Sequence, residues 1–347
     1  MSRAQLTSTV EQNTGGAVSP FAAGKNFVVN GGMDIFQRNT TITNAGASGV
    51  FLTDRWQVYC NTATGRTWSR QATSDTTNLP NIQYCVRLSR NSGDTQSGSS
   101  NSLRIWQNFE TVTSIPLAGQ TVTLSFYARA GSGATVSSIN SVIRVGTGTD
   151  QNGFYSGYTG QTDIATTTTA ITATWKRYSV TVAVPSSTTE LGVFFEYVPT
   201  GTAPANDYIE FTGVQLEIGS VATPFAKASG TLQGELALCQ RYFWQISSAN
   251  IDRVAAQAIS STRAFGPLPL PVTMRTAPSY SFAAASNFGL INSSGGVLTC
   301  TTVSIAAQAT NMVTLDFTSS GGGLTAGNAT ACWFQSTSST IALSAEL

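Results

Sequence analysis

The stretch 211–244, FTGVQLEIGSVATPFAKASGTLQGELALCQRYFW, decides how this chain is divided. Its first part is an apolar-rich run that predicts a β-strand, with a bulge at Gly213. Gly219 and Pro224 break that run. The apolar residues that follow are Leu232, Leu236, Cys239 and Phe243. Because their spacing fits an amphipathic helix, the stretch predicts the last strand of one domain and a short helix that leads into another.

The regions on both sides of this stretch show the pattern of β structure. Before it, short runs with a period of two alternate with turns rich in Gly, Ser, Asn and Pro. This predicts an all-β domain, an antiparallel jelly-roll β-sandwich, over residues 25–228. The remaining parts are an N-terminal arm over 1–24, a linking helix over 229–246 and a smaller C-terminal β-rich domain over 247–347.

Two local expectations concern the ends of these domains. Phe27–Val29 predicts a short strand, and Asn30-Gly31-Gly32 predicts a turn because positive φ is easily adopted there. The C-terminal domain has few large apolar residues, so its roughly hundred residues would make a thin core on their own. We therefore expect neighbouring chains of an oligomer to stabilise it.

The chain is poor in charge. Charged residues make up 10% of it, and 18 basic residues nearly balance 17 acidic ones. The usual charged fraction is about 25%. Near-neutrality gives no attraction to nucleic acid or to an anionic membrane surface. A weakly charged surface is poorly soluble when exposed, so the composition favours an oligomer.

Several chemistries are excluded by composition. Histidine is absent, which removes Ser-His-Asp, Cys-His and HExxH sites. The five cysteines are widely spaced without a CxxC pair, which is typical of small buried thiols. The first residues, MSRAQLTSTVEQ, contain no apolar signal core, and no apolar run approaches about 18 residues, so we expect synthesis in a cytoplasm and no membrane insertion.

Six short strings resemble, in the same order, strings of tailed-phage fibre and tail proteins. They are NFVVNGGMDIFQR from Asn26, TDRW from Thr53, SFYAR from Ser125, WKRY from Trp175, VQLEIGSVATPF from Val214 and ELALCQRYF from Glu235. In the first string Met33 and Phe36 stand where the family pattern has Phe and Trp. The resemblance implies a carbohydrate-binding-module-like jelly roll on a phage or prophage tail fibre.

Fibres of this kind are commonly homotrimers that attach a virion to a bacterial surface. The resemblance therefore implies a location in the virion tail, with other tail proteins bound through the arm 1–24 and a non-enzymatic role in host attachment. A purely structural adaptor or cement protein shares every one of these features and stays open. The candidate oligomer seam is the helical stripe Leu232, Leu236, Cys239 and Phe243; alternatively, this stripe lies on its own sandwich.

Glycan binding would need aromatic platforms with amide or carboxylate groups nearby. The candidates are Trp106, Tyr155, Tyr158 and Trp333. The competing interpretation of each is core packing. Trp56 and Trp175 are assigned to the core.

Carboxylates suggest two further hypotheses. Related sandwiches often bind a structural calcium near the start and end of the domain, where Asp34, Glu210 and Glu217 are candidate ligands; alternatively, these make caps and surface pairs. A glycan depolymerase would need two carboxylates about 5–10 Å apart. The chain offers only Asp150 and Asp163 flanking an aromatic loop, so we expect no enzyme and keep the depolymerase as the less favoured alternative.

Overall fold

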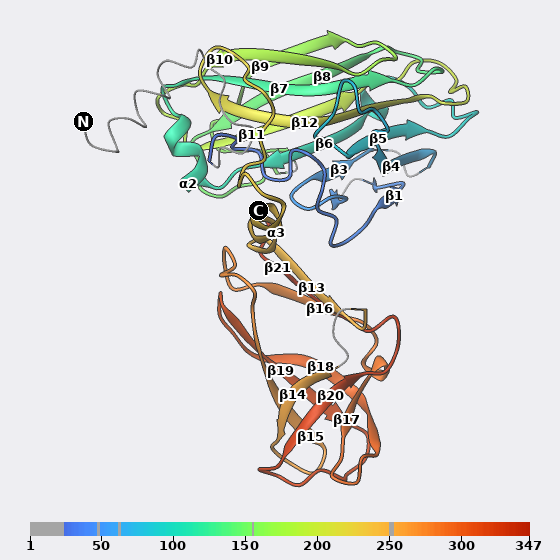
Figure 1. The fold of residues 1–347 in the computed structure, drawn as a ribbon, viewed down its shortest axis with the longest axis vertical. Helices are drawn as coiled ribbons and strands as arrows, with labels where there is room; N and C mark the ends of the chain where they lie inside the picture. The colour runs from blue at the N-terminus through green and yellow to red at the C-terminus, as the bar shows by residue number, and fades with distance from the viewer. Residues whose placement is uncertain (1–23, 47–48, 62–63, 155, 250–252) are drawn as a thin grey trace. The chain divides into compact units, whose positions relative to one another are not determined.

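The computed structural model describes residues 24–46, 49–61, 64–154, 156–249 and 253–347. The described residues up to Leu236, with Leu347, form one compact unit, and Ala237–Glu346 form a second (Figure 1). The virion-anchoring arm predicted over 1–24 lies outside the described residues except for Gly24. In the described part, strands dominate both units, which confirms the all-β class.

The first unit is a jelly-roll β-sandwich of two antiparallel sheets. In the described residues, sheet A has the order β1 (Thr41–Thr43), β4 (Arg66–Ala72), β5 (Tyr84–Arg90), β12 (Tyr208–Ile218), β7 (Thr121–Ala130) and β10 (Lys176–Ala183). Sheet B has the order β2 (Val50–Phe51), β3 (Gln57–Tyr59), β6 (Leu103–Asn108), β11 (Glu190–Tyr197), β8 (Ser138–Gly146) and β9 (Thr162–Ala170). Short helical turns lie between strands: η2 (Ser99–Asn101), α2 (Thr111–Ser114) and η3 (Ile115–Leu117).

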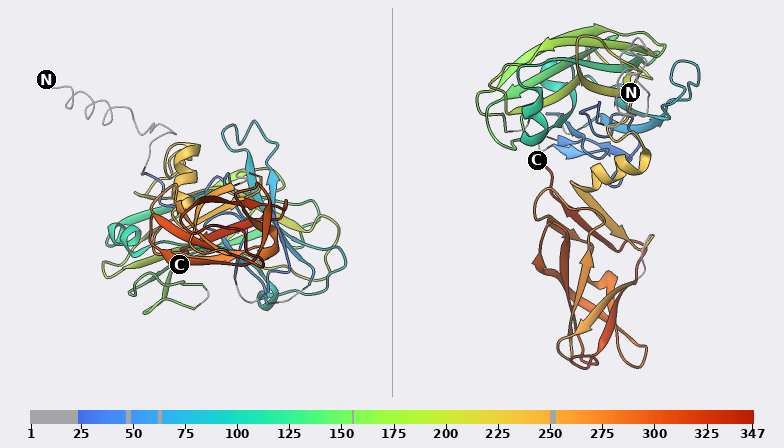
Figure 2. Two further views of the ribbon diagram at one scale, coloured as in Figure 1. Left: turned by 90° about the horizontal axis from the view of Figure 1, so that it is seen from below. Right: turned by 60° about the vertical axis from the view of Figure 1, so that its left-hand side comes forward.

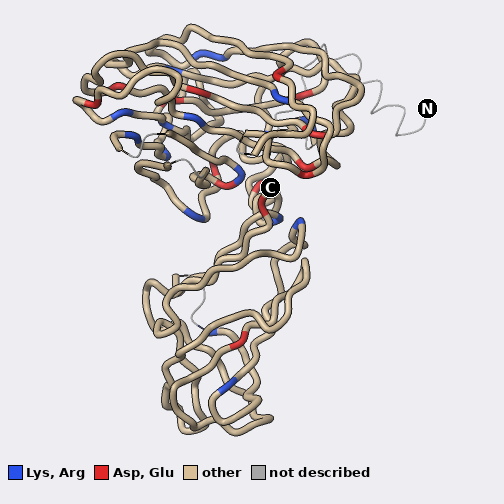
Figure 3. The backbone as a smooth tube through the Cα atoms, turned by 180° about the vertical axis from the view of Figure 1, so that it is seen from behind, with Lys and Arg blue, Asp and Glu red and all other residues tan. Residues whose placement is uncertain are grey.

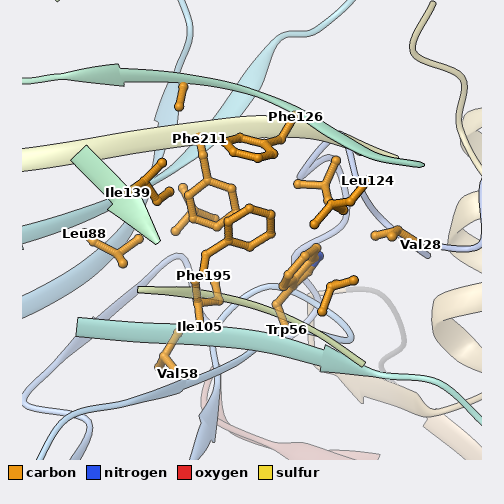
Figure 4. Packing of buried hydrophobic residues seen from close by; sticks show 14 of the residues in the cluster. Val28, Trp56, Val58, Leu88, Ile105, Leu124, Phe126, Ile139, Phe195 and Phe211 are labelled. Atoms are coloured by element: carbon orange, nitrogen blue, oxygen red, sulfur yellow. The ribbon is translucent and has the colours of Figure 1, made fainter. Parts of the chain in front are cut away.

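The core of this unit lies between the two sheets. Phe195 on sheet B stacks on Phe211 of sheet A with ring centroids 4.7 Å apart, and Phe126 meets Phe195 edge-on at 4.9 Å (Figure 4). Trp56 is fully buried beside them, as predicted. Each fully buried aromatic of this kind stabilises the fold by about 1.5–3 kcal/mol through burial alone.

The outer face of sheet A carries a second, smaller core. The loop between β4 and β5 places Leu79 and Ile82 in one cluster with Cys85 and Trp175. Trp175 is 2% exposed, in agreement with its assignment to a core. The expected bulge is present in β12, where the register shifts between Thr212 and Gln215.

Two asparagines organise the start of the first unit. The Asn26 side chain bonds the backbone of Val28, Val214, Leu216 and Ala226. Asn30 has φ 57° and its side chain bonds the backbone of residues 34, 35 and 54. Residues 27–29 lead into the turn at Asn30, and the short strand expected there is not formed.

The two glycines after Asn30 are explained by close packing. Neither Gly31 nor Gly32 has the positive φ expected from the sequence. A Cβ on Gly31 would overlap the carbonyl oxygen of Val214, whose amide donates to Gly31 O at 2.9 Å. The turn is therefore correctly predicted, but its glycines are needed because another strand approaches closely.

The end of the first unit is fastened by side chains of the VQLE string. Gln215 Oε1 accepts from the amide of Ala226 at 2.8 Å. Glu217 accepts from the amide of Thr223 at 2.9 Å and from its hydroxyl at 2.7 Å. At both ends of this unit, residues of the strings that carry the resemblance thus form hydrogen bonds that join separate segments of the chain.

The linking helix is shorter than predicted. Helix α3 spans Leu232–Gln240, and its first turn is capped by Thr231 Oγ1, which accepts from the amide of Gly234 at 3.1 Å. Phe243 begins strand β13 (Phe243–Ser247) instead of continuing the helix. The run Phe-Trp-Gln-Ile-Ser favours a strand, and it pairs with β21 (Thr340–Ser344).

The second unit combines a small sheet with a closed barrel. In the described residues, β13, β21 and β16 (Ser279–Phe282) form the sheet. The barrel order is β14 (Arg253–Ala258), β15 (Arg263–Pro269), β19 (Met312–Ser319), β18 (Val297–Gln308), β17 (Phe288–Ile291) and β20 (Ala329–Phe334). Figure 2 shows the strands of this unit in orange to red. The 3₁₀ turn η4 (Ala285–Asn287) precedes β17.

The barrel buries a core of its own. Phe288, Leu290, Leu315 and Phe317 are fully buried, and closure leaves none of the barrel strands at an open edge. These residues form the core of the barrel within one chain. Charged residues are sparse in this unit (Figure 3). In the described part of the chain, no helix is long and apolar enough to cross a bilayer.

Candidate functional site

The outer face of sheet B brings together aromatic and charged side chains from several strands. Along β6, Leu103 and Ile105 face the core, so Arg104 and Trp106 point outward. Along β11 the same alternation sends Phe194 and Glu196 outward. The register places Trp106 opposite Phe194 and Arg104 opposite Glu196.

These side chains surround a pocket of about 150 Å³. It is lined by Tyr59, Arg104, Trp106, Arg144, Phe154, Phe194 and Glu196. Phe154 stacks on Phe194 with centroids 4.9 Å apart, and Trp106 lies 6.0 Å from Phe154. Since enclosed small-molecule sites usually exceed about 300 Å³, this pocket suits one edge of a larger ligand that runs over the sheet.

The charges at the pocket are paired. Arg104 Nε donates to Glu196 Oε1 at 2.9 Å, and Arg144 Nε donates to Asp163 Oδ1 at 2.6 Å. The Arg144 guanidinium also lies 4.4 Å from the centroid of the Phe154 ring. The pocket therefore has no net charge and offers fixed donors and acceptors beside aromatic rings.

Trp106 has an unused hydrogen-bond donor. The residue is 1% exposed, and its indole N–H has no hydrogen-bond partner among the described residues. Trp68 and Trp175 share this property, but of the three only Trp106 lines this pocket. A buried unpaired donor costs about 1–3 kcal/mol, so a ligand acceptor that reached this N–H would gain a hydrogen bond.

Phe154 comes from the loop between β8 and β9, and this loop is tied to the sheet. The amide of Gly153 donates to Asn108 Oδ1 at 3.1 Å, and Arg144 Nη1 donates to Gly153 O at 2.9 Å. Asn152 Nδ2 donates to Gln57 Oε1 at 2.6 Å. These bonds position the Phe154 ring as one wall of the pocket.

Tyr158 belongs to the support of the loop. It is 5% exposed, and its hydroxyl donates to Asn108 Oδ1 at 2.9 Å. Its ring lies so close to Gly146 and Gly153 that a Cβ on either would overlap it. Burial raises the pKa of this phenol well above its usual range. Tyr158 therefore presents no ring face for a sugar, and the role predicted for it is corrected to packing.

The other glycan candidates are placed differently. Trp106 is in the pocket, although its burial makes it a wall rather than an open platform. Tyr155 lies outside the described residues. Trp333 is half-buried on β20 of the second unit, opposite Arg253 and Gly289, and does not belong to this pocket.

The three candidate calcium ligands are each engaged with basic groups. Asp34 pairs with Lys227. Glu210 accepts from Arg87 Nη2 at 2.6 Å and from Arg129 Nε at 2.5 Å. Glu217 is 3.2 Å from Lys25 Nζ.

These pairings do not suit a cation. Burial alone would raise the pKa of Glu217, but hydrogen bonds from Thr223 and Gln215 and the Lys25 charge lower it. No group of three or more acidic or thiol side chains in the described residues is arranged to hold a metal. The three carboxylates therefore do not fit one calcium site; they make the alternative surface and buried pairs.

The four side chains of the predicted oligomer seam differ in their exposure. Leu232 is 52% exposed, whereas Cys239 and Phe243 are 0% and 7% exposed. Leu236 is intermediate. Two of the four side chains are therefore buried within one chain, and Leu232 is exposed.

Sequence reasoning missed most of the pocket. Of the residues that line it, only Trp106 was predicted; the others are Tyr59, Arg104, Arg144, Phe154, Phe194 and Glu196. The alternation of LRIWQN and of ELGVFFEY was a usable signal for which side chains face outward, but it did not reveal that β6 and β11 are neighbours.

Comparisons with known proteins give a fold-level likeness only. No family model matches the chain, and no curated protein matches it. Solved structures that are similar include a family 4 carbohydrate-binding module, with 18% identity over 44% of this chain and 87% of that one and a TM-score of 0.28. TmCBM61, solved with β-1,4-galactotriose, has 13% identity over 56% and 99% with a TM-score of 0.33. The enzymatically active domain of tailspike protein 4 from bacteriophage CBA120 has 16% identity over 58% and 22% with a TM-score of 0.36.

Proposed function

We propose that this chain is a component of a phage tail fibre that attaches the virion to a bacterial surface glycan, without enzymatic activity. The observation that carries the glycan part is the unpaired indole N–H of Trp106 in a wall of aromatic rings and neutralised charges. Sugars present apolar C–H faces and many hydroxyls, and both find partners in such a pocket. The phage part is supported by the six ordered strings over residues 26–243.

The pocket is tested by binding to an array of bacterial surface polysaccharides. Trp106→Phe keeps an aromatic ring and removes the N–H, so we expect about tenfold weaker binding from the loss of roughly 1.4 kcal/mol. Trp68→Phe is the matched control, because it removes an equally unpaired indole N–H from the core of the sandwich. Equal affinity of the Trp106→Phe variant and the wild type would remove this pocket from the proposal.

The virion part needs a separate test. Labelled antibody against the full-length chain should decorate the tail of the phage that encodes it, and a deletion of residues 1–24 should prevent incorporation. A decorated tail together with silence on the glycan array would identify a structural adaptor instead of an adhesin.

We infer further that the chain is a homotrimer. The support is its 10% charged fraction, together with exposed apolar side chains such as Val112, Val221 and Leu232. Sedimentation should give three times the mass of one 36.3 kDa chain. A stable, dispersed monomer at micromolar concentration would contradict the inference.

A further inference from the structure

A second pocket lies in the first unit, where three segments distant in sequence meet. Its volume is about 340 Å³, which is within the range of about 300–1,000 Å³ that is usual for ligand sites. Its walls include Asp34, Asn81, Gln83, Phe225, Lys227 and Leu232. None of these residues lines the pocket on sheet B.

The charged groups of this pocket neutralise each other. Asp34 and Lys227 form an ion pair, with side chains 13% and 25% exposed. A pocket whose two charges are already paired gives no electrostatic gain to an acidic or a basic ligand. The chemistry therefore favours an uncharged ligand.

The amides supply the free hydrogen-bonding capacity. Asn81 and Gln83 are exposed, and their side chains make no hydrogen bond to the described residues. Each primary amide offers two donors and one acceptor oxygen. Two such groups, separated in the chain by Ile82, suit a ligand with adjacent hydroxyls.

An aromatic ring completes the site. Phe225 is partly buried and packs against the cluster of Leu79, Ile82, Cys85 and Trp175, which fixes its ring. A Cβ on Gly32 would lie 2.8 Å from Asp34 Oδ2 and 3.4 Å from Phe225 Cζ. The absence of a side chain at position 32 therefore leaves room for the ion pair and the ring to lie close together.

We propose that this pocket binds one uncharged pyranose residue, with its C–H face on Phe225 and its hydroxyls on Asn81, Gln83 and the Asp34–Lys227 pair. This pocket would be a second sugar site on the same unit. It rests on the proposed function only because it assumes that the ligand is a sugar. Two sites on one unit, repeated in an oligomer, would multiply the avidity for a polysaccharide.

The test is saturation-transfer NMR on the full-length chain with the methyl glycosides of glucose, galactose, mannose and N-acetylglucosamine. All samples carry Trp106→Phe, which weakens the pocket on sheet B and keeps the two sites separate. Asn81→Ala with Gln83→Ala should lower the affinity by about tenfold for each lost hydrogen bond. Gln120→Ala is the control, because this exposed amide likewise lacks a partner and lies outside the pocket.

The outcomes separate the two proposals. Transfer to at least one glycoside that the Asn81/Gln83 substitutions weaken and Gln120→Ala preserves would support the second site. Transfer of equal strength with and without those substitutions, or no transfer to any glycoside, would overturn it. Neither result decides the proposed function, which depends on the comparison of Trp106→Phe with the wild type on polysaccharide.

Discussion

Arg90 and Asp207 form an ion pair with 2.6 Å between Nε and Oδ2, although neither side chain is exposed. The same guanidinium donates to the carbonyls of Gln96, Thr200 and Gly201. One arginine thus holds the loops that follow β5 and β11. Removing it leaves a buried carboxylate and three carbonyls without this donor.

We expect Arg90→Leu to lower the free energy of unfolding by about 3–5 kcal/mol, the cost of breaking a buried pair. The control is Arg104→Leu, whose side chain is 33% exposed and whose pair should contribute about 0–1 kcal/mol. Urea unfolding followed by tryptophan fluorescence measures both. Similar losses in the two variants would contradict the role assigned to burial.

Glu210 is the second structural carboxylate. It is fully buried on the outer face of sheet A between Arg87 and Arg129, which lie opposite it on the two neighbouring strands. Glu210→Gln keeps the shape and removes the charge that both arginines share. We expect a loss of about 1–3 kcal/mol in unfolding free energy, and less for Glu196→Gln, whose side chain is 13% exposed.

The pH dependence of stability should reveal Glu217. Its pKa is lowered in the folded chain because its hydrogen bonds and Lys25 outweigh the effect of burial. Its contribution is therefore present above the unfolded pKa of about 4.3 and is lost as pH falls through the folded pKa. The difference in unfolding free energy between wild type and Glu217→Gln should be constant near neutral pH and shrink below about pH 4. Parallel curves down to pH 3 would contradict this.

Gly31 should not tolerate a side chain. Gly31→Ala places a methyl group on the backbone carbonyl of Val214, so the turn or strand β12 must move. We expect a loss of more than about 2 kcal/mol, as for other overpacked sites, measured by thermal unfolding. Gly321→Ala is the control, since a Cβ there meets nothing within 4 Å, and its unfolding temperature should stay within a degree or two.

Metal removal should leave the protein unchanged. Asp34, Glu210 and Glu217 each face a basic side chain, so a chelator has no shared cation to withdraw from them. We expect the same unfolding temperature with EDTA and with millimolar calcium. A stabilisation by calcium that Glu210→Gln abolishes would show that these pairs open to admit the ion.

The sequence was most informative where side chains bond the local backbone. Asn26, Asn30 and Gln215 stand in strings that resemble phage tail proteins, and each satisfies backbone groups that the fold would otherwise leave unpaired. The predicted end of the linking helix was wrong at Phe243. An aromatic residue fits the apolar face of a helix as well as it fits the start of a strand, so the local sequence did not distinguish the two. Pairing with β21, a hundred residues away, decided between the two.

By itself, the sequence determined the β class and the side chains that alternate along each strand, because a period of two is a local property of the backbone. Only the tertiary structure decided which strands are neighbours and which aromatics reach a surface. Trp106 and Phe194 face each other because β6 pairs with β11 in one register, and a shift of one residue would turn both into the core. Tyr158 is also an aromatic residue in a loop, but it is buried because Gly146 and Gly153 leave room for its ring.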